Sequence, residues 1–164
     1  MSFLSPGYSY GNPFYRPLAG VQGELFIVNK GSVYSMLTND FSVFKRVIDT
    51  SVLYRGILNN LEMPVTLVIP PDSVLPDEVK RHLLSLDRAE ATTLLSYHTI
   101  EKGVKWLDGH THQTRHGGII LARIGNTLIL PKGESKQQIN LLSNGNYFVN
   151  GVVYVIDQPI IASV

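Results

Sequence analysis

The sequence predicts an α+β fold, because helical and strand-forming patterns occupy different parts of the chain. Up to about Tyr97, apolar residues recur at the spacing of amphipathic helices. After Trp106, short β-branched and aromatic runs alternate with turn residues, as is typical of strands. A chain of 164 residues is long enough for one domain with its own core.

The segment 1–23 shows neither periodicity. It is rich in proline and glycine and carries five aromatic residues, namely Phe3, Tyr8, Tyr10, Phe14 and Tyr15. Chain ends are often solvated and mobile, but disordered tails usually contain few aromatics. We therefore interpret residues 1–23 as an extended arm that binds a neighbouring protein through these aromatics, and residues 24–164 as a single domain.

The domain is expected to begin with a short strand over Glu24–Val28 and a helical turn that Ser32 caps. A helix should follow, with Asp40 or Ser42 as its cap. Its core-facing stripe consists of Phe41, Phe44, Val47 and Ile48.

A further short helix is predicted around Leu53, Ile57 and Leu58. Val65–Ile69 is a continuous apolar strand, which Pro70 and Pro71 end because proline lacks the N–H that a β-ladder needs.

Two more helices are predicted after this strand. The sequence Pro76-Asp77-Glu78 has the proline and acidic residues that favour a helix N-terminus. Asp87 and Glu90 form a capping-box pattern for a helix that ends near Tyr97.

The remaining chain is predicted to form strands, with a turn at Gly125-Asn126. The predicted strands are Ile119–Arg123, Thr127–Leu130, Gln137–Leu142, Tyr147–Val149 and Val152–Ile156.

Three segments, in this order, resemble the fasciclin-like domain family: Thr66–Leu75, Leu94–His98 and Asn150–Asp157. The last is the most specific, because Asn-Gly-Val-Val-Tyr-Val-Ile-Asp is similar to the closing signature of that family. The resemblance implies a β-sandwich or wedge with helices packed at one side, and non-catalytic adhesion. It marks as framework residues Thr66, Pro70, Asp72, Tyr97, His98, Asn150, Gly151, Tyr154 and Asp157.

The chain also departs from the family pattern. Pro71 replaces Thr or Asn, Val74 replaces a small Ala, and Tyr154 replaces a His. Several family members bind integrins through an Asp-Ile pair, and the matching positions here are Gly145 and Asn146. The carboxylate is missing, so the resemblance does not imply integrin binding for this chain.

The residues themselves favour structural roles for these motifs. Asn150-Gly151 suits a tight turn with positive φ. In the strand that follows, Val153 and Val155 should face one side, and Val152, Tyr154 and Ile156 the other. Tyr97 and His98 should satisfy backbone groups at a buried helix-to-strand corner.

The sharpest chemical pattern is a run of imidazoles beside a carboxylate, at Asp108, His110, His112 and His116. On a strand, His110 and His112 would share a face and could bind zinc, copper or nickel. The alternative is an exposed polar loop, which the neighbouring Arg115 favours. We expect no resident metal and no cofactor, and keep this segment as the weaker candidate.

Motifs for catalysis are missing from the sequence. It contains no Gly-x-Ser-x-Gly elbow, phosphate-binding loop, His-Glu-x-x-His or dinucleotide fingerprint. It also contains no cysteine, which excludes disulfides and thiolate zinc sites. The chain is therefore not expected to be an enzyme.

The charge and the apolar runs limit the partners. Lys and Arg total 14 against 13 acidic residues, a net charge of +1, so nucleic acid and anionic membranes are not expected partners. No apolar run approaches the roughly 20 residues that span a bilayer, and residues 1–20 do not resemble a secretory signal. Charged residues are only 16% of the chain, which favours a partly covered surface.

Three functional hypotheses follow. The first is a structural component of a homo- or hetero-oligomeric assembly, such as a viral capsid, virion or surface layer, in which the arm lies across a neighbour. The second is a cell-surface adhesion module of the fasciclin type that is exported by an unrecognised route or numbered from a processed form. The third is metal or small-ligand binding through the histidine segment.

Overall fold

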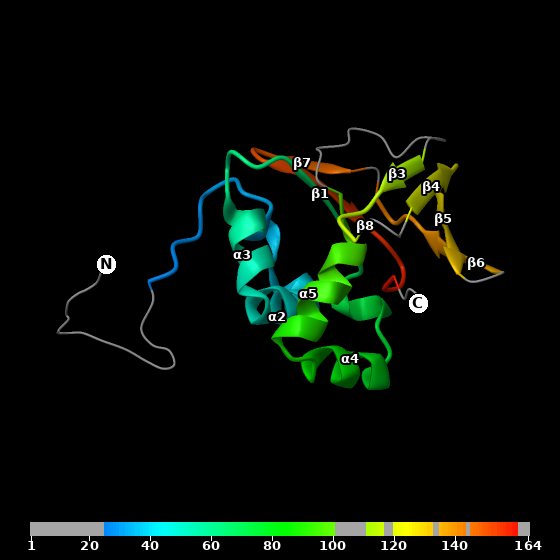
Figure 1. The fold of residues 1–164 in the computed structure, drawn as a ribbon, viewed down its shortest axis with the longest axis horizontal. Helices are drawn as coiled ribbons and strands as arrows, with labels where there is room; N and C mark the ends of the chain where they lie inside the picture. The colour runs from blue at the N-terminus through cyan, green and yellow to red at the C-terminus, as the bar shows by residue number, and fades with distance from the viewer. Residues whose placement is uncertain (1–24, 101–110, 117–119, 133–134, 144, 161–164) are drawn as a thin grey trace.

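The computed structural model describes residues 25–100, 111–116, 120–132, 135–143 and 145–160. Within these ranges the chain forms four α-helices, three 3₁₀ turns and two four-stranded sheets (Figure 1). The helical elements are η1 (Tyr34–Met36), η2 (Asn39–Phe41), α2 (Ser42–Thr50), α3 (Val52–Asn59), η3 (Asp72–Val74), α4 (Asp77–Leu84) and α5 (Arg88–Tyr97). The α+β class is confirmed.

The first sheet has the strand order β2-β1-β8-β7. Its strands are β1 (Val65–Ile69), β2 (Thr99–Ile100), β7 (Asn146–Phe148) and β8 (Gly151–Val155). β1 and β8 are parallel neighbours, with Leu67 opposite Val153, although these two residues are 86 positions apart in the chain. The centre of the sheet thus joins the helical part of the chain to its C-terminal part.

The second sheet is antiparallel, with the order β3-β4-β5-β6. Its strands are β3 (Thr111–Gln113), β4 (Ile120–Ile124), β5 (Thr127–Lys132) and β6 (Ser135–Asn140). The predicted turn at Gly125-Asn126 joins β4 to β5, and Gly125 has a φ of 63°, which favours glycine.

The described residues bury two hydrophobic clusters on the two faces of the first sheet. One lies between this sheet and the helices and includes Phe44, Ile48 and Leu58. The other lies between the two sheets and includes Leu128 and Ile139. Figure 1 shows the helices gathered on one side of β1 and β8, so the predicted sandwich with helices at one side is confirmed.

Strand β8 lies between the two clusters, and the predicted alternation of its side chains between the two faces of the sheet is confirmed. Val153 and Val155 pack against the helical cluster. Val152, Tyr154 and Ile156 belong to the cluster between the sheets. A one-residue slip in register would exchange the two sets, so the pattern fixes the register.

The predicted strand at Glu24–Val28 is wrong, since residues 25–29 have no regular secondary structure. Their backbone groups bond to the side chain of Asn59 instead. The Asn59 Oδ1 accepts from the N–H of Asn29 at 2.7 Å, and its Nδ2 donates to the Ile27 carbonyl at 2.8 Å. These bonds replace the strand partner that the apolar pattern suggested.

Three helical caps test the sequence predictions. Asp87 and Glu90 form the expected capping box, because each side chain accepts from the other residue's N–H. Ser32 accepts from the N–H of Ser35 at 3.1 Å, as predicted for the first turn. Asp40 and Ser42 do not cap α2, however, because an acceptor from elsewhere in the chain takes that place.

The predicted strands β4, β5, β7 and β8 are present with bounds that shift by one or two residues, and further differences occur elsewhere. The two short strands β2 and β3 were not predicted, and β6 begins and ends two residues before the predicted Gln137–Leu142. β6 ends early because Leu141 forms a bridge with Ile156 and the N–H of Leu142 donates to Val155. The described part of the chain contains no helix with the length and apolar character needed to cross a membrane.

Candidate functional site

The Asp72 motif residue holds the start of α2. It follows β1 and the buried Pro70. Its Oδ1 accepts from the N–H of Val43 at 3.0 Å, and its Oδ2 accepts from the Ser42 hydroxyl. The first turn of a helix has N–H groups without intrahelical partners, so this carboxylate acts as a cap from 29 residues away.

Tyr97 and His98 end α5, and His98 is fully buried. Its Nδ1 lies 2.8 Å from the Leu94 carbonyl, and its Nε2 accepts from the N–H of Ile160 at 2.9 Å. The second bond requires a neutral Nε2, which assigns the proton to Nδ1. Burial lowers the pKa of His98 to about 4, in agreement with a neutral ring that ties α5 to the C-terminal segment.

Asn150 is a second buried polar link. Its Oδ1 accepts from the N–H of Val33 at 2.7 Å, and its Nδ2 donates to the Leu58 and Asn60 carbonyls at 3.0 and 2.9 Å. It therefore joins three segments that are far apart in sequence. Asp157 makes a similar link near the surface, where its two oxygens accept from the backbone and side-chain nitrogens of Asn140.

The prediction of positive φ at Gly151 is wrong. The glycines with positive φ in the described ranges are Gly31, Gly125 and Gly145. Gly151 is required for another reason, because a Cβ at this position would lie 1.9 Å from the Val65 carbonyl oxygen. The parallel pairing of β1 with β8 leaves no space for a side-chain carbon. Thr66 and Tyr154, the other motif residues of these strands, are buried.

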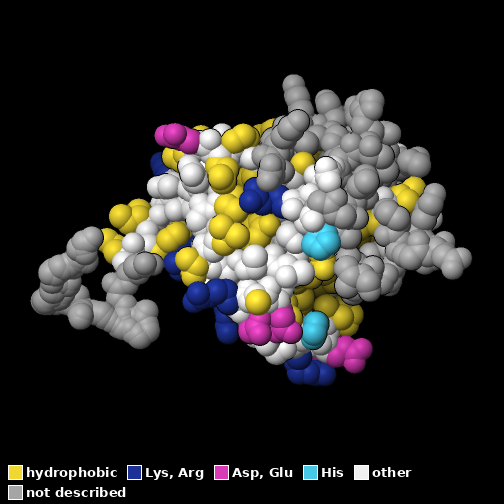
Figure 2. Space-filling view, in the orientation of Figure 1, with side chains coloured by type: hydrophobic (Ala, Val, Ile, Leu, Met, Phe, Trp, Pro, Cys, Tyr) yellow, Lys and Arg dark blue, Asp and Glu magenta, His cyan; other side chains and the backbone are white. Residues whose placement is uncertain are grey.

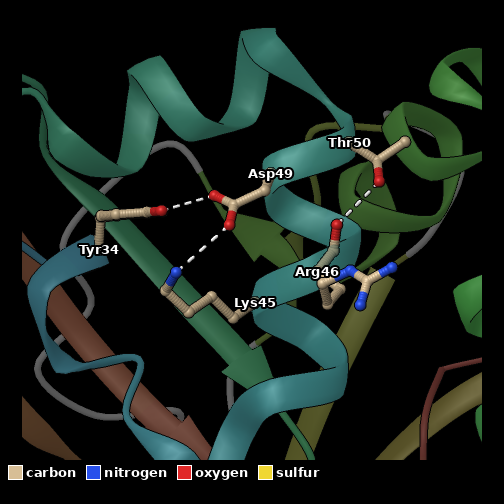
Figure 3. Close-up of polar contacts among 5 residues, drawn as sticks. All are labelled: Tyr34, Lys45, Arg46, Asp49 and Thr50. Atoms are coloured by element: carbon tan, nitrogen blue, oxygen red, sulfur yellow. Dashed lines mark hydrogen bonds and ion pairs between the residues drawn. The ribbon is translucent and has the colours of Figure 1, made fainter. Parts of the chain in front are cut away.

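A cluster outside the motifs joins η1 to α2 (Figure 3). The Tyr34 hydroxyl donates to Asp49 Oδ1 at 2.5 Å, and Lys45 Nζ lies 3.3 Å from Asp49 Oδ2. Burial and the Asp49 carboxylate raise the pKa of Tyr34. Partial burial opposes the charge on Lys45, but Asp49 outweighs it and raises the pKa of Lys45. Both shifts favour the protonated forms, so the cluster holds η1 on α2 and offers no activated base or nucleophile.

The histidine segment is described only in part. Asp108 and His110 lie outside the described residues, and His112 is placed only as a backbone position on β3, opposite Leu121. The exposed ring of His116 packs edge-on against Tyr97 at 4.8 Å. Among described residues, no three His, Cys, Asp or Glu side chains converge to hold a metal ion.

The arm residues Phe3, Tyr8, Tyr10, Phe14 and Tyr15 also lie outside the described residues. The surface that could receive an arm is described, and it includes an apolar groove of about 390 Å³ between α4 and α5. We call it the α4–α5 groove. It is lined by Glu78, Val79, His82, Leu83, Leu86, Glu90, Thr93, Leu94, Tyr97 and Pro159. Figure 2 shows hydrophobic side chains over these helices at the lower edge of the molecule, with acidic side chains and a histidine beside them.

A more open hollow of about 530 Å³ lies beside strand β7, and we call it the β7 surface. Its exposed apolar side chains are Leu61, Tyr147 and Val149. β7 is the last strand of its sheet in the described residues. Strands at the edge of a sheet are common sites for protein contact.

Sequence reasoning did not find the groove. Val79, Leu86 and Leu94 are apolar residues of the kind that usually belong to a core, and here each is only partly buried. The spacing of these residues shows that two neighbouring helices each have an apolar face. The spacing does not show that a hollow lies between the two faces, because a hollow depends on how the helices pack.

Comparison with known proteins agrees with this architecture. The family model of the fasciclin domain matches residues 39–162. A solved FAS1 domain pair from the insect cell adhesion molecule fasciclin I is similar in fold, with a TM-score of 0.61 and 17% identity. The match covers 82% of this chain and 52% of the solved chain, so this chain spans about half the length of that pair. No curated protein matches the sequence.

The family match extends over most of the chain, from η2 to beyond the last described residue. The three motif segments found in the sequence all lie within it. The chain belongs to the fasciclin domain family.

Proposed function

We propose that this protein is a non-enzymatic component of a larger assembly, such as a shell or surface layer, in which residues 1–23 contact a neighbouring molecule. Fasciclin domains are protein–protein interaction and adhesion modules, and this membership supports the general class. The assembly role is the finer proposal, and it depends on what the chain exposes.

The observation that carries the proposal is the separation of polar and apolar groups. The buried polar side chains Asn150 and His98 direct their hydrogen bonds to backbone groups of the fold. Apolar side chains, in contrast, remain open in the α4–α5 groove and on the β7 surface. Open apolar hollows are typical of sites that bind other molecules.

The experiment is a mass measurement by light scattering across a range of protein concentrations. It compares the full chain with a chain of residues 25–164, which keeps both described hydrophobic clusters, because they span Val33 to Ile160. We expect the full chain to form larger species and the shortened chain to remain monomeric. Equal masses at every concentration, alone and with extract from the native source, would contradict the proposal.

A control separates the aromatics from the length of the arm. In the full chain, serine replaces the five aromatics, which are Phe3, Tyr8, Tyr10, Phe14 and Tyr15. Loss of association in this variant assigns the contact to the aromatic side chains. Association equal to that of the unmodified chain would show that these side chains do not make the contact.

The β7 surface favours a second candidate, a surface adhesion module that binds a foreign protein. Tyr147 and Val149 are 55% and 68% exposed beside a strand edge. If this candidate is correct, Tyr147→Ser should reduce binding to native extract, and removal of residues 1–24 should leave binding unchanged.

A further inference from the structure

We propose that the α4–α5 groove is the receptor for the arm of a neighbouring copy, and that the segment Phe14–Leu18 is the part that enters it. The inference rests on the proposed function, because it assumes that the arm contacts a neighbour. It adds the receiving surface, the contacting segment and the identity of the neighbour as a second copy of this chain.

The shape of the groove suits aromatic side chains. Its floor combines the buried Leu83 and Tyr97 with the partly buried Val79, Leu86 and Leu94. A volume of about 390 Å³ is at the small end of ligand sites, which run from roughly 300 to 1,000 Å³. Aromatic anchors in apolar pockets are the commonest hot spots of protein interfaces.

The charge of the groove points to a cationic segment as its occupant. Glu78 and Glu90 are exposed where they line it, and neither has a cationic partner within the described part of the chain. One Glu90 oxygen accepts from the N–H of Asp87, which fixes this carboxylate in place. An apolar floor beside two carboxylates should select an apolar segment that carries a positive charge.

The arm has this composition. In residues 1–23, Arg16 is the one charged residue, and it is basic. Arg16 stands directly after Phe14 and Tyr15 and two residues before Leu18. Pro13 and Pro17 restrict the backbone of this stretch toward extended conformations, which lowers the entropy lost on binding.

The other hollows fit this segment less well. The β7 surface is more open and has one carboxylate, Glu62, among its lining residues. A hollow beside η2 and η3 is lined mainly by polar and charged residues, namely Asn39, Asp40, Asp72, Ser73 and Lys80, together with Pro71. Of these three hollows, the α4–α5 groove therefore matches both properties of the segment best.

The direction of the chain favours a neighbour over the same molecule. The described chain begins on the α3 side of the molecule, away from α4 (Figure 1). Leu25 and Ile27 are 86% and 66% exposed, so the described chain begins at the surface of the molecule. One arm and one groove per copy give a heterologous contact, which forms a ring where the rotation closes and a filament where it does not.

A charge exchange tests the contact in the full chain. Glu78→Lys and Arg16→Glu should each weaken self-association by roughly tenfold, because each change places like charges together. The double variant with both changes should recover most of the association. Asp77→Lys is the matched control, since Asp77 lies in the same first turn of α4 but does not line the groove.

A mixing experiment tests whether the contact joins two copies. The chain of residues 25–164 offers a groove without an arm, and full-length Glu78→Lys offers an arm with a blocked groove. We expect the two to form a one-to-one complex that sedimentation detects. If no such complex forms, the neighbouring copy is not the partner and the inference is wrong.

The outcomes also separate this inference from the proposed function. If removal of the arm abolishes association but Glu78→Lys and Arg16→Glu associate normally, the arm binds elsewhere and only the groove assignment is overturned. If removal of the arm changes nothing, the proposed function itself is overturned. Recovery in the double variant, with Asp77→Lys unaffected, supports the groove.

Discussion

The inner framework and the α4–α5 groove differ in how they use polar groups. In the framework, Asn150 makes three hydrogen bonds at 2.7 to 3.0 Å, and both ring nitrogens of His98 have backbone partners. In the groove, the carboxylate of Glu78 is exposed at the edge of an apolar floor. The framework pairs its buried polar groups within the fold, whereas the groove leaves apolar side chains and a carboxylate exposed.

The two regions meet at Tyr97 and His98. Tyr97 lines the groove, and the next residue, His98, is fully buried. The C-terminal segment repeats this division, because Pro159 lines the groove and the N–H of Ile160 donates to His98. The family motif segments therefore supply only Leu94 and Tyr97 to the lining of the groove. The family motif residues thus indicate the fold of the chain. A surface that is specific to one partner has to be looked for among the other residues.

The largest effect should follow from breaking the framework at Gly151. In Gly151→Ala the new Cβ would lie 1.9 Å from the Val65 carbonyl oxygen, so β1 and β8 would have to separate. We expect the free energy of unfolding to fall by roughly 3 kcal/mol or more, as urea denaturation would measure. Such a loss would remove the sheet on which both hydrophobic clusters rest.

Gly56→Ala is the matched control. Gly56 lies in α3, and a Cβ there would meet no atom within 4 Å. Alanine favours a helix over glycine, so this variant should gain about 0.5–1 kcal/mol. A Gly151→Ala protein as stable as the unmodified chain would show that the close approach of β1 and β8 does not govern the sheet.

Acid should weaken the framework through His98. Its pKa is about 4 in the folded protein, against an ordinary histidine value of 6.5, so the unfolded chain takes up the proton first as pH falls. The stability from neutral His98 is complete above about pH 6.5 and is lost as pH falls from there to about 4. Each pH unit in this window costs about 1.4 kcal/mol, so roughly 2 kcal/mol should be lost from pH 7 to pH 5.

The control is His98→Gln, which cannot titrate. Urea denaturation between pH 5 and pH 7 should show a flatter dependence of unfolding free energy on pH for this variant, although it is less stable at pH 7. Identical pH dependence in the two proteins would mean that His98 does not control acid stability and that carboxylates do.

Local patterns predicted the parts of the fold that local physics decides. The apolar stripe of Phe44, Val47 and Ile48 specifies α2, and the alternation of Val152, Val153 and Tyr154 specifies both faces of β8. The Asp87 capping box involves residues three positions apart, and it was also predictable. In each case the partners are close in sequence.

Contacts between distant segments could not be predicted from one sequence. Leu25–Val28 has a strand-like composition, but the side chain of Asn59 takes the neighbouring backbone groups. The groove depends on the packing of α4 against α5, and its acidic residues look like ordinary helix-start residues in the sequence. The parallel pairing of β1 and β8 likewise explains Gly151, for which the sequence suggested a turn.

Substitutions at the start of α2 compare the cap that the sequence suggested with the cap that the structure shows. The sequence favoured Asp40 or Ser42 as the cap, but the structure gives this role to Asp72. Asp72→Ala should lower the free energy of unfolding by about 1 kcal/mol, the usual value of a lost cap, whereas Asp40→Ala should change it by less than about 0.5 kcal/mol. Both residues place a carboxylate near the start of α2, so equal losses would indicate general attraction to the helix dipole instead of hydrogen bonding. A larger loss for Asp40→Ala would restore the cap that the sequence suggested and would remove Asp72 from the framework.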